Sequence, residues 1–236
     1  MLGLRLEGEG SHLKAAHVET SRMKPVGLAL LIALIAAPAS AATCAPPTLT
    51  RIVTRSVGPD ILLGSFNAEP VTLYRKGERH LRNEEAPDPE QRRHLLTIVA
   101  EPDIWMINLM DQTGKHLVDP GPIFVAHAPI VAGQGVPAVF QELEFGCEAA
   151  FVRARGREAG VRTVDGKTAR IYALQAGDQR LEVLLTDRGV PAEVAYYQGA
   201  RTVLTIRYDA FETGLPDDPR LFQKPAGVTF RAEAPR

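Results

Sequence analysis

The chain has 236 residues, of which 45% are hydrophobic and 23% are charged, enough apolar content for one domain with a sizeable core. Its 27 basic and 28 acidic residues give a formal net charge of −1 at pH 7. Because nucleic-acid binding needs a concentrated basic face, this balance argues against nucleic acid as a partner.

The N-terminal region contains the three parts of a signal peptide. Lys24 supplies a positive charge, residues 26–37 form an uncharged apolar stretch, and Ala39-Ser40-Ala41 has the small-x-small pattern that a signal peptidase cleaves. The apolar stretch is about a dozen residues long, below the roughly 18 to 20 that span a bilayer, so we expect no retained transmembrane segment.

This leader predicts the domain organisation and the location. Translation is expected to begin at Met23, which makes residues 1–22 a mis-assigned or disordered extension and residues 23–41 the signal peptide. Residues 42–236 would then form a single domain that is periplasmic or secreted.

Two cysteines, Cys44 and Cys147, lie beyond the predicted cleavage point. In an oxidising compartment a cysteine pair is more often a disulfide than a redox or metal site, so we expect them to be bridged. Two free thiols are the alternative. Lipid modification of Cys44 fits poorly, because Ala41-Ala42-Thr43 departs from the lipoprotein pattern.

A run of strands is predicted before residue 119. Residues 71–75 and 78–82 alternate in polarity around the tight turn Lys76-Gly77, which indicates a hairpin. The other predicted strands of this half are residues 48–57, 94–100, 104–110 and 115–118.

The middle of the chain differs in character. Residues 133–137 are too flexible for a regular element, whereas residues 138–152 place apolar side chains among polar ones at a helical spacing. One or two helices are therefore expected between residues 120 and 156.

The C-terminal third returns to strands. They are residues 167–175, 179–186, 190–197 and 201–211. The turns between them are short and contain glycine, and such turns join only antiparallel neighbours. Alternate apolar positions, such as Leu181, Val183 and Leu185, give each strand one buried face, so the segment is predicted to be a meander.

This order of parts resembles the superfamily of outer-membrane lipoprotein carriers, the LolA-like and LolB-like proteins and their stress-sensor relatives. The resemblance covers roughly residues 71–230 and includes the strand of Trp105. The segments that carry it read VTLYRKGERHLR, VDGKTARIYAL, LEVLLTDRGVPAEVAYYQGARTVLTIRYDAFETG and PDDPRLFQKPAGVTF.

The resemblance implies an α+β fold: an unclosed, strongly curved antiparallel β half-barrel whose concave face is covered by one or two helices. It also implies a cavity that can hold lipoprotein acyl chains. Two features depart from the family: Ala45-Pro46-Pro47 and the strand-like residues 48–57 leave little room for its opening helix, and the residues that couple the carrier to its membrane partners have no identifiable match. Fold alone does not fix function.

An antiparallel sheet must cover its apolar concave face with helix, ligand or partner. A single helix over a wide sheet would leave a lipid-sized hydrophobic groove, and ordinary core packing is the alternative for each residue that could line it. The candidates are Leu73, Trp105, Ile107, Leu109, Val183, Val194, Tyr196, Leu204 and Ile206.

No catalytic residue, metal site or cofactor is predicted. Residues 133–138 match G-x-G-x-x-A formally, but that motif requires a parallel βαβ unit and the predicted sheet is antiparallel. The histidines His80, His94, His116 and His127 lack ligand spacing. No G-x-S-x-G motif occurs, so the chain is expected not to be an enzyme.

The one basic cluster is Arg153, Arg155 and Arg157. It could contact an anionic headgroup or an acidic partner beside the groove, or it could be the solvated end of a helix, where cations are favoured by the macrodipole. The sequence thus predicts an exported, non-enzymatic protein that binds a lipid, an acyl chain or a similar hydrophobic ligand. The alternative is a module that binds an envelope protein or senses envelope state, with no lipid ligand.

Overall fold

The computed structural model describes residues 44–62, 64–118 and 127–231. The expectations for the leader fall on residues 1–41 and lie outside these described residues. The strands are β1 (Leu49–Val57), β2 (Val71–Lys76), β3 (His80–Glu84), β4 (Leu95–Ala100), β5 (Asp103–Asn108), β6 (Thr113–Val118), β7 (Arg157–Val164), β8 (Lys167–Ala176), β9 (Gln179–Thr186), β10 (Pro191–Gln198), β11 (Arg201–Leu215) and β12 (Thr229–Arg231). The helices are α1 (Ala138–Gln141) and α2 (Glu148–Arg155), with 3-10 turns η1 (Phe66–Ala68) and η2 (Pro219–Phe222).

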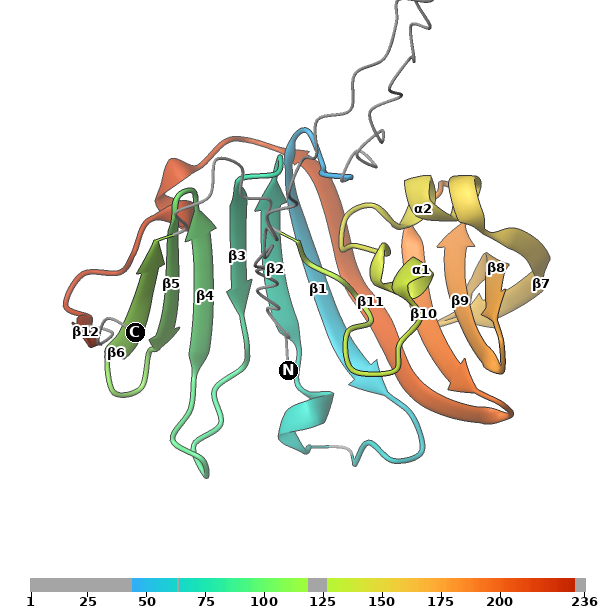
Figure 1. The fold of residues 1–236 in the computed structure, drawn as a ribbon, viewed down its shortest axis with the longest axis horizontal. Helices are drawn as coiled ribbons and strands as arrows, with labels where there is room; N and C mark the ends of the chain where they lie inside the picture. The colour runs from blue at the N-terminus through green and yellow to red at the C-terminus, as the bar shows by residue number, and fades with distance from the viewer. Residues whose placement is uncertain (1–43, 63, 119–126, 232–236) are drawn as a thin grey trace, which may run out of the picture. The chain divides into compact units, whose positions relative to one another are not determined.

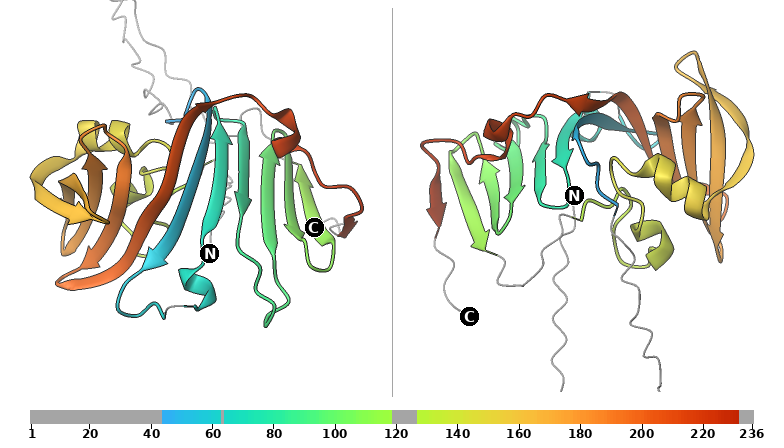
Figure 2. Two further views of the ribbon diagram at one scale, coloured as in Figure 1. Left: turned by 180° about the vertical axis from the view of Figure 1, so that it is seen from behind. Right: turned by 90° about the horizontal axis from the view of Figure 1, so that it is seen from above.

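All twelve strands form one sheet, in the order β12-β6-β5-β4-β3-β2-β1-β11-β10-β9-β8-β7 (Figure 1). Two meanders, β1 to β6 and β7 to β11, are joined by antiparallel pairing of β1 with β11 in the middle of the sheet. Every neighbouring pair is antiparallel except β12 and β6. The sheet is strongly curved and does not close, which confirms the predicted half-barrel (Figure 2).

Turn chemistry explains why consecutive strands pair. Asp165 and Gly166, between β7 and β8, both have positive φ, at 48° and 76°. Two consecutive positive φ values are the geometry of the hairpin turn that Asp-Gly favours, and this turn matches the right-handed twist of the flanking strands. The β7–β8 hairpin is therefore encoded locally.

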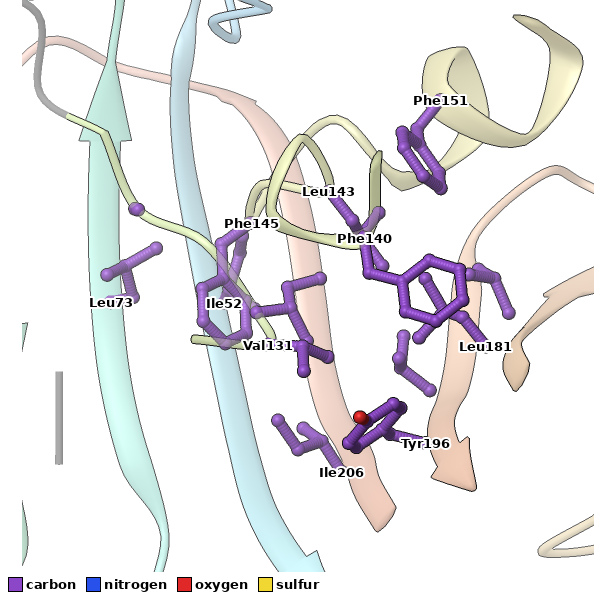
Figure 3. Packing of buried hydrophobic residues seen from close by; sticks show 14 of the residues in the cluster. Ile52, Leu73, Val131, Phe140, Leu143, Phe145, Phe151, Leu181, Tyr196 and Ile206 are labelled. Carbon is purple, nitrogen blue, oxygen red and sulfur yellow. The ribbon is translucent and has the colours of Figure 1, made fainter. Parts of the chain in front are cut away.

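An insertion, residues 127–156, packs on the concave inner face of the sheet (Figures 1 and 2). Its apolar side chains Phe140, Leu143 and Phe145 join one cluster with residues of the sheet such as Ile52 and Leu181 (Figure 3). Phe140 and Leu143 have no exposed surface. The insertion thus supplies the covering that an apolar sheet face requires.

A second core lies on the opposite, outer face of β4 and β5. Leu96, Ile98 and Ile107 pack there against Phe222, which comes from the C-terminal strap, residues 216–231. The strap then adds β12 beside β6. Strands β4 and β5 therefore bury side chains on both faces, because Val99 and Ile104 belong to the inner cluster. Thr97 and Met106, further along the same inner face, belong to neither cluster.

The helical region contains two short helices, α1 and α2, in agreement with the one or two that were expected, and Gly146 before α2 has a φ of +89° that other residues rarely adopt. The sequence prediction was incomplete at two strands. The edge strands β7 and β12 were not predicted, because β7 is exposed along most of its length and β12 has only three residues. Arg157 therefore begins a strand and does not end a helix.

Candidate ligand-binding face

The insertion occupies the region where the groove was predicted. Six of the nine candidate groove residues belong to the cluster that it covers, and five of them are less than 10% exposed. They are Leu73, Val183, Val194, Tyr196, Leu204 and Ile206. Phe140 contacts Tyr196 edge-on, with ring centroids 6.1 Å apart. These six residues line an inner face that is filled by the protein's own side chains.

The other three candidates, Trp105, Ile107 and Leu109, are on the outer face. They pack under the C-terminal strap, and Trp105 stacks on His116 with ring centroids 5.5 Å apart. The nine candidates therefore lie on two faces of the sheet. The reason is that Trp105, Ile107 and Leu109 alternate along the chain with Ile104, which belongs to the inner cluster, so these three side chains point to the outer face under the C-terminal strap.

Part of the inner face over β4, β5 and β6 is open, beyond the buried Val99 and Ile104. A cavity of about 320 Å³ is found there. Its lining residues are Leu95, Leu96, Thr97, Met106, Ile107, Asn108, Thr113, Gly114, Lys115 and Arg231. Strand register aligns Thr97 with Met106, Met106 with Lys115, and Lys115 with Arg231, so these four side chains form one row across the sheet.

Met106 is an exposed apolar side chain in this row. It is 41% exposed, whereas Ile107, the next residue, is 1% exposed in the outer core. Because successive side chains of a strand point to opposite faces, this contrast places the cavity on the inner face. The row therefore combines an apolar floor with two cations, Lys115 and Arg231, at its β6–β12 end.

The charge at that end is positive. The Thr113 hydroxyl donates to Asp111 Oδ1 at 2.7 Å and lowers the pKa of this carboxyl, and the nearby charge of Arg231 lowers it further. Asp111 therefore stays ionised and offsets part of one cation. Within the described residues, Lys115 has no ion-pair partner.

A buried polar cluster fastens the insertion to the sheet. Arg75 of β2 and Glu144 of the insertion form an ion pair, and their side chains are 0% and 3% exposed. Arg75 Nη1 also donates to the Phe145 carbonyl at 2.9 Å, and Glu144 Oε1 lies 2.7 Å from Nδ1 of His127. Two buried charges are tolerable only when paired and hydrogen-bonded in this way.

The start of α2 adds two more attachments. Cys147 forms the expected disulfide with Cys44, with a Cα separation of 5.9 Å. Glu148, which is 1% exposed, accepts hydrogen bonds from the Tyr208 hydroxyl at 2.7 Å and from the Gly146 amide at 3.0 Å. Burial raises the pKa of Glu148 to about 7, against the lowering effect of these hydrogen bonds and of Arg75.

The predicted basic cluster lies at the other end of the insertion. Arg155 and Arg157 line a cavity of about 500 Å³ between the insertion, β7 and β8, together with Val139 and Leu174. Arg155 pairs with Glu142 at 2.9 Å. Arg153 is exposed and does not line this cavity.

The remaining chemical candidates are dispersed. No group of three or more His, Cys, Asp or Glu in residues 44–62, 64–118 and 127–231 could hold a metal ion. The glycine motif leads into α1, which has only four residues, and the strands around it are antiparallel. No helix within these ranges is long and apolar enough to cross a membrane.

Sequence reasoning missed Met106, Lys115 and Arg231. Alternation offered one signal, because a strand that places Trp105 and Ile107 on one face must place Met106 on the other. No local signal could pair Arg231 with Lys115, since β12 joins β6 through a connection of more than a hundred residues.

Comparisons with known proteins identify no family. No protein-family model matches the chain, and no curated protein matches it. An uncharacterized conserved protein from Thermus thermophilus has a similar fold, with a TM-score of 0.46 and 11% identity, over 78% of this chain and 91% of that one.

The structure of the Pseudomonas aeruginosa MucA/MucB complex matches with a TM-score of 0.41 and 11% identity, over 80% of this chain and 60% of that chain. A structure of MucB in complex with MucA(peri) matches with a TM-score of 0.38 and 11% identity, over 79% and 58%. The present chain thus spans less than two thirds of both matched chains. These are likenesses of fold at low identity, and no assignment of function follows from them.

Proposed function

We propose that the protein is an exported, non-enzymatic binding protein that holds an amphiphile with one acyl chain and an anionic headgroup on the inner face of β4–β6. The observation that carries this proposal is the 320 Å³ cavity with Met106 on its floor and the cations Lys115 and Arg231 at one end. The export rests on the leader predicted from the sequence.

The size of the cavity limits the ligand. Small-molecule sites have volumes of roughly 300–1,000 Å³, so this cavity is at the small end of the range and suits a single chain. Each methylene removed from water contributes about 0.8 kcal/mol, so a chain of about ten carbons gains enough to be held reversibly.

The two cations specify the headgroup. An ammonium and a guanidinium at one end of an apolar floor attract a carboxylate or phosphate, and Arg231 offers the planar donors that bind such groups in a bidentate manner. A zwitterionic or neutral headgroup would gain less. The six predicted groove residues under the insertion are assigned to core packing in this proposal.

Displacement of a fluorescent probe tests the proposal. The full chain is titrated with 11-(dansylamino)undecanoic acid, and the probe is displaced with lysophosphatidylglycerol or with lysophosphatidylcholine. Met106→Glu places a charge on the cavity floor and is expected to weaken probe binding more than tenfold. Met110→Glu is the matched control, because Met110 is 47% exposed and does not line the cavity.

The expected results are that the Met110 variant binds like the wild type and that the anionic lysolipid displaces the probe at lower concentration than the zwitterionic one. Equal binding by the wild type and the Met106 variant would contradict the site. Equal displacement by the two lysolipids would contradict the role of Lys115 and Arg231.

A second candidate is a protein-binding or envelope-sensor module without lipid. It is favoured by one observation: the inner face over β8–β11 is already covered by the insertion, so the largest apolar surface of the sheet needs no lipid. If the wild-type protein fails to bind the probe at all, this second candidate is preferred.

A further inference from the structure

We propose that the β7 edge of the sheet binds an extended, acidic segment of a partner protein by strand addition. This inference is independent of the amphiphile site, which lies on β4–β6. It rests on an exposed edge strand, two cavities beside it, and an excess of unpaired cations around it.

β7 pairs with β8 and has no strand on its other side among the described residues. Its residues 157–161 and 163 are exposed, including Val161 at 61%. An unpaired strand presents N–H and C=O groups to which an extended peptide can add, and pockets beside the strand then select its side chains.

A β-bulge limits the length that can pair. The register shifts between Glu158 and Gly160, and Gly160 has a φ of +136° with open space where a Cβ would lie. Beyond it, residues 160–164 form a regular ladder with β8. The edge therefore offers about five residues at roughly 3.3 Å each, which suits a short segment.

Two cavities lie along this strand, and both contain cations. The cavity of about 500 Å³ contains Arg155 and Arg157, beside the start of β7. The other, of about 1020 Å³, is lined by Val161 with Lys167, Arg170 and Arg188. Because Glu158 lines both, the two cavities adjoin the same strand.

The local charges favour an acidic partner. Within the described residues Arg153, Arg157, Lys167 and Arg188 have no ion-pair partner, and all four are exposed. The acidic side chains nearby are largely matched: Glu142 pairs with Arg155 at 2.9 Å, and Glu158 with Arg170 at 3.4 Å. Asp187 is the unmatched acid of the larger cavity.

The same charges argue against a second copy of this chain. An antiparallel copy of β7 would bring its own exposed Arg157 to a surface that is already basic. The bulge would also interrupt pairing between two copies, as it does at many protected edges.

The test uses a fluorescein-labelled heptapeptide of alternating Glu and Val, and its Lys and Val counterpart, added to the full chain. Fluorescence anisotropy is expected to show binding of the acidic peptide alone, weakening as salt rises. The double variant Lys167→Glu, Arg188→Glu should raise Kd at least tenfold. Arg201→Glu, which changes an exposed, unpaired arginine at the start of β11, should leave Kd within twofold.

Amide hydrogen exchange of the wild-type protein tests the strand addition without any substitution, so the test holds if the double variant fails to fold. Slowed exchange of amides in residues 160–163 upon addition of the acidic peptide is expected. Equal binding of the two peptides, an unchanged Kd in a folded double variant, or protection confined to residues outside β7 would overturn the proposal.

Discussion

Glu148 shows how strongly one buried carboxyl depends on its surroundings. It lies at the first position of α2, where it is 1% exposed, and one of its oxygens receives both the Tyr208 hydroxyl and the Gly146 amide. The other oxygen is buried without a hydrogen-bond partner. A neutral, protonated carboxyl suits this environment, and desolvation accordingly raises its pKa to about 7.

The raised pKa of Glu148 makes the stability of the protein depend on pH. The pKa of Glu148 is higher in the folded state than its ordinary value of 4.5, so its favourable contribution is present below about pH 4.5 and is lost as the pH rises through about 7. A pKa raised from 4.5 to about 7 corresponds to about 3 kcal/mol of stability.

We expect Glu148→Gln, which is neutral at every pH, to remove this loss. Urea unfolding at pH 4.5 and at pH 8 gives the free energy of unfolding at each pH. Between these two pH values, this free energy should fall about 3 kcal/mol less in the variant than in the wild type. Parallel pH dependence of the two proteins would show that Glu148 is not held neutral by burial.

Residue-scale features were the least predictable from the sequence. Arg75 sits in the alternating hairpin strand as an ordinary polar residue, but its partner Glu144 is 69 positions away, and only the folded insertion brings the two together. The sequence contains no local signal for such a pair, because both residues look like solvent-facing charges until the tertiary contacts exist.

At the scale of elements, the insertion depends on its attachments as well as on its apolar side chains. Cys44 precedes β1, and Cys147 precedes α2, so the disulfide ties the start of the described chain to the insertion across 103 positions. Arg75 reinforces this joint, because its Nη2 donates to the Cys44 carbonyl at 3.1 Å.

Removal of the disulfide is expected to destabilise the protein by about 3 to 5 kcal/mol, because a loop of this length carries a large closure entropy. Urea unfolding of Cys44→Ser, Cys147→Ser measures the loss. As a control, the wild type in reducing agent should unfold at the same urea concentration as the variant. A variant as stable as the oxidised wild type would contradict a structural role for the bridge.

Most elements were predictable because their signals are local. Glycine turns such as Lys76-Gly77 and Gln198-Gly199 predicted the hairpins, and period-two alternation predicted which face of β9 is buried. β7 lacked that alternation, since a bulged edge strand in water needs no apolar face. β12 depends on pairing with β6, a contact without any local signature.

At the scale of the whole sheet, the placement of the two coverings determines which surface stays open. The inner cluster of the insertion covers β8–β11 and extends past β1 as far as Val99 and Ile104, and the C-terminal strap covers the outer face of β4 and β5. Alternation alone predicted that each strand has one buried face, but it could not predict that β4 and β5 bury side chains on both faces. Six of the nine predicted groove residues therefore lie in the cluster under the insertion, and the open cavity is over β4–β6.

Native mass spectrometry of the protein, expressed with its own leader and purified from a bacterial periplasm without detergent, tests the central claim most directly. For the wild type and for Met110→Glu, we predict a bound mass that on fragmentation releases one anionic amphiphile with a single acyl chain. For Met106→Glu, we predict that this bound mass is absent. Observation of only the ligand-free mass in the wild type, or of the same bound lipid in Met106→Glu, would contradict the account.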